Sequence, residues 1–204
     1  MSADQLSLTR DVGRTRDELD RHFTPDACAD LLVRSVLRYR YGAGYTGVST
    51  PRLVVEPSVG GGAFARALRR HAPDAMVVGV DIDPAAEGRA DVDKFVCADW
   101  LTLDYSAGAA DLIVGNPPFT GTTAIAHVRR CLEVADVVAL ILPWAPLGGV
   151  AAWDELMDGE YRPNEVYPIT PRPWPSSVRE TALYVWESGV LPSTTSVRRI
   201  GRWR

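Results

Sequence analysis

The sequence predicts an α/β domain built on a mainly parallel sheet, and three observations lead to this fold class. Several short runs are apolar throughout, which is typical of strands that are buried on both faces. These runs alternate with amphipathic segments at helical spacing. The length of 204 residues suits one domain that buries a sizeable core. Ligands of such sheets bind at the carboxyl ends of the strands.

The expected elements follow one another without repeats. We expect helices within residues 23–41, 63–71 and 122–135, and strands at 52–56, 75–81, 94–99, 111–115 and 137–143, then a final strand pair at 164–170 and 181–187. The first helix is expected to begin at Pro25, with Thr24 as its cap. Its buried face is predicted from the spacing of Cys28, Leu32, Val36 and Tyr39.

Composition excludes several classes of protein. The formal net charge is −4, so the chain as a whole is not a basic nucleic-acid coat. Cys28, Cys97 and Cys131 form no CxxC and lie near no histidine at metal-ligand spacing, which predicts neither a disulfide framework nor a zinc site. The first residues are polar, and prolines interrupt the longest apolar run. We therefore expect a cytoplasmic protein without a membrane span.

A glycine-rich turn follows the first predicted strand, in the stretch "EPSVGGG" at residues 56–62. Gly60, Gly61 and Gly62 allow a tight turn and close approach of a ligand, and the next helix begins there with free N–H groups. Nicotinamide and flavin enzymes also have a glycine-rich turn, but this one is not GxGxxG. A purely structural turn is the alternative.

Acidic residues follow the next two strands. Asp81 ends its strand nineteen residues after Gly62, where a carboxylate accepts the hydroxyls of a ribose. Asp83 is the alternative acceptor, with a turn-capping role beside Pro84 as its structural explanation. Asp99 is a candidate acceptor for the amino group of an adenine, with Trp100 as a stacking face or a core residue. The residues at the ends of these strands predict a pocket that fits a nucleoside. Because the sequence has no GxxxxGK[ST] loop, we expect a ligand other than ATP.

The stretch "NPPF", residues 116–119, follows the fourth strand. Two prolines fix the backbone and remove two N–H donors. The Asn116 amide oxygen and the Pro117 carbonyl remain as two acceptors, which suit the two N–H bonds of a planar amino group, and Phe119 adds a flat apolar face. Such preorganised acceptors hold and orient a nucleophilic nitrogen. A proline-rich loop with a core phenylalanine is the structural alternative.

These motifs together resemble the S-adenosylmethionine-dependent amino-methyltransferases, most closely the N6-adenine DNA methyltransferase-like proteins. "FTP" at 23–25 is similar to the family segment at the methionine end of the cofactor, "EPSVGGG" to its cofactor motif, and "NPPF" to its catalytic (D/N/S)PP(Y/F) motif. The resemblance covers residues 23–119. "PRPWPSSVRETALYVWE" is only loosely similar to phage-type members, and residues 1–20 are not covered.

The resemblance implies a Rossmann-like class I methyltransferase, with a seven-stranded, mainly parallel sheet whose last strand is antiparallel. S-adenosylmethionine is the implied cofactor, and the N6 amino group of adenine in DNA is the implied target. The methyl group then passes directly to the nitrogen, Asn116 and Pro117 hold the amino group, and Phe119 stacks on a base that is flipped out or single-stranded. The implied catalytic residues are Asn116, Pro117, Pro118 and Phe119. The implied cofactor-binding residues are Phe23, Thr24, Pro25, Glu56, Pro57, Ser58, Gly60, Gly62, Asp81, Ile82, Asp99, Trp100 and Asn116, and no metal is implied.

We divide the chain into a polar N-terminal segment (1–21), a methyltransferase domain (22–190) and a basic C-terminal tail (191–204). The tail combines arginines with Trp203, which suits a nucleic-acid strand, although a frayed terminus is an equal alternative. About fifty residues follow the fifth strand, which leaves little chain for reading base edges. A protein partner that supplies target recognition is therefore expected.

Three alternatives to DNA methylation stay open. The same motif serves enzymes that methylate guanine N2 in ribosomal RNA or glutamine amides in proteins. The chain is otherwise a non-catalytic, cofactor-binding subunit of a methyltransferase complex. The sequence argues against C5-cytosine methylation, because that chemistry needs a Pro-Cys nucleophile and none of the cysteines follows a proline. DNA is the preferred nucleic-acid partner and RNA the second.

Overall fold

The computed structural model describes residues 23–42, 50–106, 108–118, 123–144, 154, 156–157, 161–169, 180–190 and 192–200. The helices are α1 (Asp26–Tyr41), α2 (Ala63–His71), a single 3-10 helix (Glu87–Ala90) and α3 (Thr123–Val134). The strands are β1 (Leu53–Glu56), β2 (Met76–Asp81), β3 (Lys94–Cys97), β4 (Ala110–Gly115), β5 (Ala135–Pro143), β6 (Glu165–Pro168), β7 (Thr181–Glu187) and β8 (Ser196–Val197).

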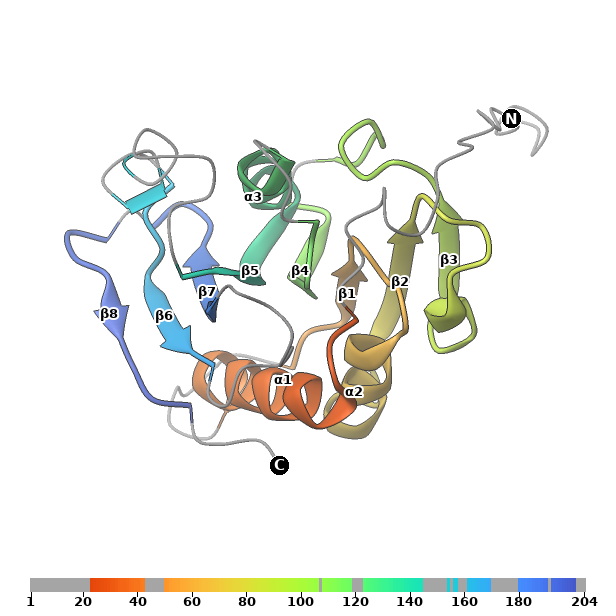
Figure 1. Cartoon of the computed structure of the whole chain (residues 1–204), viewed down its shortest axis with the longest axis horizontal. Coiled ribbons are helices and arrows are strands. Elements are labelled where there is room, and N and C mark those ends of the chain that lie inside the picture. The colour runs from red at the N-terminus through yellow and green to blue at the C-terminus, as the bar shows by residue number, and fades with distance from the viewer. Residues whose placement is uncertain are drawn as a thin grey trace.

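The strands form one mixed sheet in the order β3-β2-β1-β4-β5-β7-β6-β8. The first five strands in this order pair in parallel, and β7 runs antiparallel between β5 and β6. Figure 1 shows α1 and α2 on one face of the sheet and α3 on the other. The predicted α/β class and the antiparallel strand near the end are confirmed.

The strand count is corrected from seven to eight. Ser196 and Val197 form β8, which pairs in parallel with β6 within the segment that we assigned to a basic tail. Two hydrogen bonds fix this short strand, because the N–H of Ser196 donates to the carbonyl of Asn164 and the N–H of Arg198 donates to that of Val166. The polar composition of the segment gave no strand pattern, since an edge strand this short needs no apolar face.

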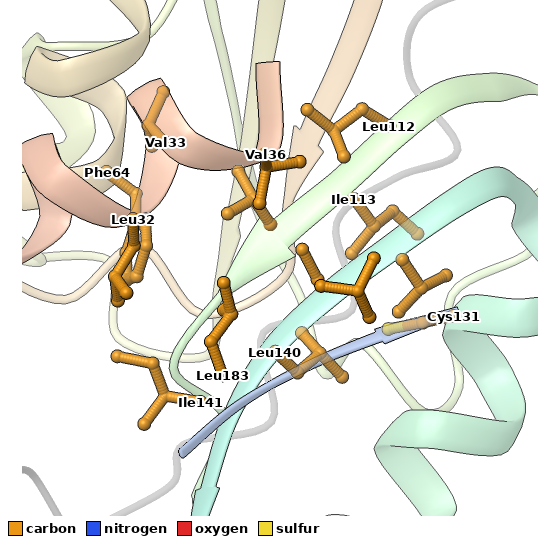
Figure 2. Close-up of a cluster of buried hydrophobic side chains, with 14 of the residues drawn as sticks. Leu32, Val33, Val36, Phe64, Leu112, Ile113, Cys131, Leu140, Ile141 and Leu183 are labelled. Carbon is orange, nitrogen blue, oxygen red and sulfur yellow. The ribbon is translucent and has the colours of Figure 1, made fainter. Parts of the chain in front are cut away.

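The core lies between the sheet and its helices. Figure 2 shows Leu32 and Val36 of α1 gathered near Ile113 of β4, Leu140 of β5 and Leu183 of β7. All of these side chains are buried. Strands β4, β5 and β7 are apolar over most of their length, and most of their residues are buried.

Two expectations for α1 are wrong. Pro25, not Thr24, occupies the cap position, and no side chain caps the helix. The carbonyl of Pro25 accepts the N–H groups of Cys28 and Ala29 instead, at 2.9 and 3.0 Å. Tyr39 is exposed rather than in the core, and its ring lies 6.1 Å from that of Tyr167.

Candidate functional site

The carboxyl ends of the parallel strands meet at the point where the strand order reverses. Strand β1 pairs with β2 on one side and with β4 on the other. The chain that leaves β1 at this edge therefore continues to β2 and β3 in one half of the sheet. The chain that leaves β4 continues to β5 in the other half. In doubly wound sheets this reversal marks the crevice in which ligands bind. The three predicted motifs after β1, β2 and β4 all lie here.

The glycine turn after β1 needs its glycines for backbone reasons. Gly60 has φ +48° and Gly62 has φ +77°, both in the left-handed region that favours glycine. Gly62 is also the cap residue of α2. A Cβ on Gly62 would lie 2.5 Å from Asp91 Oδ2 and 2.7 Å from the Cα of Gly88. The close packing of two backbone segments thus excludes any side chain at Gly62.

The predicted Phe23–Pro25 segment lies against this turn. A Cβ on Gly60 would lie 3.1 Å from Cε1 of Phe23, and one on Gly61 would lie 3.5 Å from its Cγ. The Phe23 ring therefore covers the turn, while 41% of the residue stays exposed. Segments that are separated by 36 residues in the sequence thus form one wall of the site.

Asp81 fixes the other side of the turn. Its Oδ2 accepts the N–H of Gly60 at 2.8 Å, and its Oδ1 accepts the N–H of Asp83 at 2.9 Å. The side chain is only partly buried, so each carboxylate oxygen keeps a lone pair for a ligand. Ile82 is also half-buried, and Asp83 accepts the N–H of Ala85, which matches its alternative turn-capping role.

The end of β3 lies beside Asp81, because the N–H of Ala98 donates to the Asp81 carbonyl at 3.0 Å. Asp99 is exposed there, and its Oδ1 accepts the N–H of Leu101 at 3.0 Å. Trp100 is only 2% exposed, and its ring packs at 5.5 Å from that of Tyr105. Trp100 is therefore a core residue, and its ring presents no open face for a ligand.

Glu56, the last residue of β1, is 1% exposed. Burial raises the pKa of its carboxyl well above the ordinary range, against a lowering effect of the Ala65 backbone N–H. Its Oε2 accepts no hydrogen bond from the residues that the structure describes. A buried polar atom of this kind at a ligand edge is satisfied by a bound group or water. Ser58 lies two residues further along and is half-buried.

The proline motif lies directly beside the glycine motif. A Cβ on Gly115 would lie 3.2 Å from Cδ of Pro57 and 3.9 Å from Cγ of Glu56. Asn116 and Pro118 are half-buried and Pro117 is buried. Phe119 lies outside the described residues. The ends of β1 and β4 thus bring Gly115, the residue directly before the proline motif, close to Glu56 and Pro57.

Arg66, on the first turn of α2, belongs to the site but was not predicted from the sequence. Its guanidinium contacts Asp26, the carbonyl of Gly61 and Asp91. These partners come from three separate parts of the chain. The only sequence signal was a basic residue one turn after the glycine motif, and this signal does not specify any partner.

His127 and the cysteines take structural positions. His127 is buried, its Nδ1 lies 2.9 Å from the Thr123 carbonyl, and burial lowers its pKa. Cys28 and Cys131 are buried while Cys97 is exposed, and none forms a disulfide. Within the described residues no cluster of acidic, histidine or cysteine side chains is arranged to hold a metal ion. No helix in that part of the chain is long and apolar enough to cross a membrane.

Comparison with known proteins identifies solved structures with a similar fold. The fold matches solved structures over most of the chain. A provisionally assigned RNA methyltransferase from Pyrococcus horikoshii aligns with a TM-score of 0.63 at 16% identity, covering 87% of this chain and 92% of its own. The chain has the class I S-adenosylmethionine-dependent methyltransferase fold.

Two further relatives of this methyltransferase-fold chain come from DNA restriction and viral systems. The methyltransferase subunit of a type I restriction-modification system from Streptococcus thermophilus aligns with a TM-score of 0.65 at 13% identity, covering 90% of this chain and 49% of its own. The type II methyltransferase M.CvrRI of Paramecium bursaria Chlorella virus XZ-6E is 32% identical over 109 residues, which are 52% of this chain. The chain spans about a quarter (26%) of that relative.

No model of a protein family matches the chain. The comparisons support the resemblance to DNA methyltransferase-like proteins and S-adenosylmethionine as the cofactor. The residues present also fit this cofactor. The Asp81 carboxylate has acceptor capacity left at the edge of the site, and Glu56 contributes a buried oxygen that lacks a partner among the described residues.

Proposed function

We propose that the chain is an S-adenosylmethionine-dependent methyltransferase that methylates the N6 amino group of adenine in DNA. One observation carries the proposal: Pro57 of the glycine motif lies close to Gly115, the residue directly before Asn116 and Pro117. A methyl donor on the glycine turn and an amino group on the proline motif would then be neighbours. Direct transfer requires this proximity.

The catalytic part of the proposal rests on two hydrogen-bond acceptors, which belong to Asn116 and Pro117. When bound, S-adenosylmethionine supplies an electrophilic methyl group on a positively charged sulfur. The Asn116 amide oxygen and the Pro117 carbonyl accept the two N–H bonds of the target amino group and direct its lone pair. Pro117 and Pro118 have no N–H groups that would compete for these acceptors. Phe119 stacks on the target base, which is extruded from the helix or single-stranded.

In the cofactor part of the proposal, Phe23, Thr24 and Pro25 contact the methionine end of S-adenosylmethionine. Asp81 takes the ribose hydroxyls and Asp99 the adenine amino group, because their strand ends follow one another along the edge of the sheet. Glu56, Pro57, Ser58, Gly60, Gly62, Ile82 and Asn116 line the remaining contacts. Trp100 is left out, because its side chain is in the core.

DNA is supported as the substrate by the restriction-modification and viral methyltransferases among the relatives and by the motif resemblance. The net charge of −4 argues against strong binding of phosphates by the chain alone. We therefore propose that a partner protein contributes target recognition. The arginine-rich segment 191–204 is proposed to contact the nucleic acid, and the cytoplasm is the proposed location.

The test is transfer of radiolabelled methyl groups from S-adenosylmethionine to duplex DNA, single-stranded DNA, ribosomal RNA and whole-cell protein. Label in DNA, recovered as N6-methyladenine after digestion and lost in Asn116→Ala, is the expected result. Asn164→Ala is the matched control, because the other asparagine of the sequence lies at the opposite edge of the sheet and accepts the N–H of Glu187.

Other results assign other functions. Label in RNA or protein alone would keep the chemistry and replace the substrate. If no substrate is labelled although calorimetry detects cofactor binding, the chain is a non-catalytic subunit or requires its partner. Unchanged transfer by Asn116→Ala would refute the role of the proline motif.

A further inference from the structure

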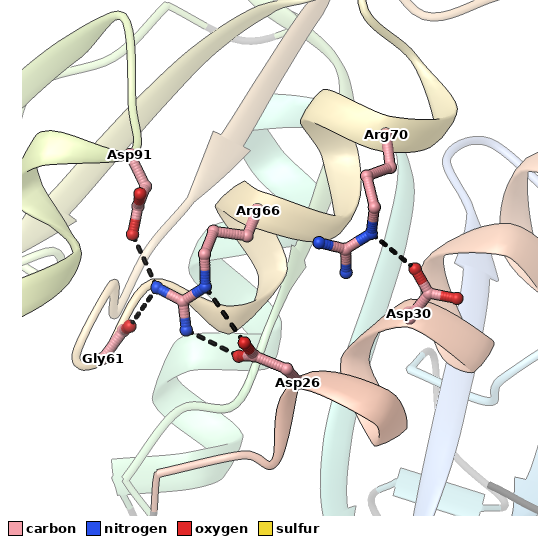
Figure 3. Close-up of polar contacts among 6 residues, drawn as sticks. All are labelled: Asp26, Asp30, Gly61, Arg66, Arg70 and Asp91. Atoms are coloured by element: carbon pink, nitrogen blue, oxygen red, sulfur yellow. Dashed lines mark hydrogen bonds and ion pairs between the residues drawn. The ribbon is translucent and has the colours of Figure 1, made fainter.

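The side chain of Arg66 joins three segments of the candidate site. Its Nη2 and Nε donate to the two carboxylate oxygens of Asp26, at 2.5 and 3.2 Å. Its Nη1 donates to the Gly61 carbonyl at 2.7 Å and to Asp91 Oδ2 at 2.6 Å. Figure 3 shows the guanidinium between these partners, with Asp26 on one side and Asp91 on the other.

Each partner belongs to a different wall of the site. Asp26 directly follows the Phe23–Pro25 segment and begins α1. Gly61 is the middle of the glycine turn. Asp91 follows the 3-10 helix between β2 and β3, a connection that is tied to the turn by the bond from Gly88 N–H to the Gly60 carbonyl at 2.9 Å. One planar side chain therefore sets the distances among all three walls.

Only arginine has the geometry for these contacts. The guanidinium fork offers five N–H donors in one plane, two of which match the two oxygens of a carboxylate. The third nitrogen, Nη1, has two N–H bonds and donates to both the Gly61 carbonyl and Asp91. Since Asp26 is close to Phe23 in the chain, the bidentate pair also fixes the ring that covers Gly60.

We infer that Arg66 is a positioning residue for the cofactor, which holds the Phe23–Pro25 segment against the glycine turn. The inference rests on the proposed function, because the positioned groups are those assigned to S-adenosylmethionine. Arg66 acts through Phe23 and Gly61 and is not itself assigned a contact with the cofactor.

The charges agree with this role. The hydrogen bond to Asp26 raises the pKa of Arg66, and the hydrogen bond from Arg66 lowers the pKa of Asp26. The pair therefore stays ionised across the neutral range. Its exposed setting makes it a weak contributor to stability, because water screens such pairs. Its effect is therefore expected in the geometry of the site more than in the stability of the fold.

The structure provides a matched control one turn further along α2. Arg70 Nε donates to Asp30 Oδ1 at 2.8 Å, so this pair also joins α2 to α1 and is also exposed. Figure 3 shows that the Arg70 pair lies along the same two helices as the Arg66 pair, away from Gly61 and Asp91. Losing the Arg70 side chain thus removes an ion pair between the same two helices without releasing a wall of the site, while His71 Nε2 still lies 2.9 Å from Asp30 Oδ1.

The experiment is isothermal calorimetry of S-adenosylhomocysteine binding to the full chain, its Arg66→Gln variant and its Arg70→Gln variant. We expect the Kd to rise about tenfold for Arg66→Gln, the usual consequence of losing a charge-assisted hydrogen bond, and to stay within about twofold for Arg70→Gln. The melting temperatures of the two variants, measured without ligand, are expected to fall by similar amounts. Arg66→Lys keeps the positive charge but lacks the planar, forked set of N–H donors. Its Kd for S-adenosylhomocysteine is therefore expected to lie between the values of the unaltered chain and of Arg66→Gln.

Asp26→Ala is the second variant, because Asp26 is exposed and its loss leaves the fold intact even if Arg66→Gln does not fold. It is expected to raise the Kd in the same direction. Equal affinities for the full chain, Arg66→Gln and Asp26→Ala would overturn the inference and leave the proposed function standing. A rise of the same size in Arg70→Gln would also overturn it. No binding by the unaltered chain would overturn the proposed cofactor and this inference with it.

Discussion

At the scale of single residues, glycines permit backbone conformations that other residues rarely adopt. Gly62 and Gly108 both have positive φ, +77° and +64°, so an L side chain strains the backbone at either position. The two differ in their surroundings. A Cβ at Gly62 meets Asp91 and the Gly88 backbone, whereas one at Gly108 meets nothing within 4 Å.

This difference predicts unequal effects of alanine. Gly62→Ala is expected to lower the free energy of unfolding by about 3 kcal/mol, the sum of backbone strain and overpacking. Gly108→Ala is expected to lower it by about 1 kcal/mol, from strain alone. Urea denaturation with a shared m-value measures both. Equal losses would show that the close packing at Gly62 relaxes without penalty.

The sequence predicted the backbone motifs of the site well and the side-chain network poorly. Gly60, Gly62 and Asp81 were predictable because a glycine turn and an acidic residue at strand ends have local signatures, and the structure brings them together. Arg66 was not, because its partners Asp26 and Asp91 lie 40 and 25 residues away. Trp100 was ambiguous, since an aromatic residue after a strand suits a stacking face and a core position equally.

At the scale of elements, strands β5, β7 and β6 form the centre of the second half of the sheet. Leu140 of β5 pairs with Tyr184 of β7, and Val166 of β6 pairs with the same residue from the other side. Leu183 is fully buried next to them. The packing of β7 therefore connects both neighbouring strands to the core.

We predict that Leu183→Ala lowers the free energy of unfolding by about 3 kcal/mol, through lost burial and the cavity that remains. Val190→Ala, directly after the exposed turn that follows β7, is the control, because Val190 is 50% exposed and its change is expected to stay within about 0.5 kcal/mol. Chemical denaturation monitored by tryptophan fluorescence measures both. A small loss for Leu183→Ala would mean that β7 separates from the sheet before the rest unfolds.

The elements themselves were largely predictable, because apolar runs and helical spacing are local signals. The predicted strands at 75–81 and 111–115 agree with β2 and β4 to within a residue. Their order in the sheet is not a local property and was not predicted, whereas the antiparallel strand was implied by the resemblance. The two-residue strand β8 and the cap of α1 were mispredicted because backbone hydrogen bonds, rather than side-chain patterns, determine both.

The stability of the whole molecule depends on pH through two opposite trends. Asp26 and Asp93 have pKa values lowered by hydrogen bonds from Arg66 and Arg69. Their contribution is present above the unfolded pKa of about 3.9 and is lost as the pH falls through the folded values. Glu56 has a raised pKa, so its contribution is present below the unfolded pKa of about 4.3 and is lost as the pH rises toward the folded value.

We therefore predict that Glu56→Gln gains melting temperature relative to the unaltered chain as the pH rises from 5 to 8. The amide has the shape of the neutral acid but does not titrate, so the variant is expected to gain most at pH 8. Differential scanning calorimetry without ligand is the measurement. Glu133→Gln, at an exposed carboxyl, is the control and should leave the slope unchanged. Parallel curves for Glu56→Gln and the unaltered chain would mean that Glu56 is ionised in the folded state.

The position of β7 has a consequence for synthesis on the ribosome. Chains emerge from the amino terminus and fold as they lengthen. Strands β1 to β5 are translated in an order that lets them pair as they appear, whereas β7 is made after β6 and lies between β5 and β6. Until residues 181–187 have emerged, the apolar edge of β5 has no neighbour on that side. This interval is when a nascent chain is most exposed to pairing with other chains and most in need of a chaperone.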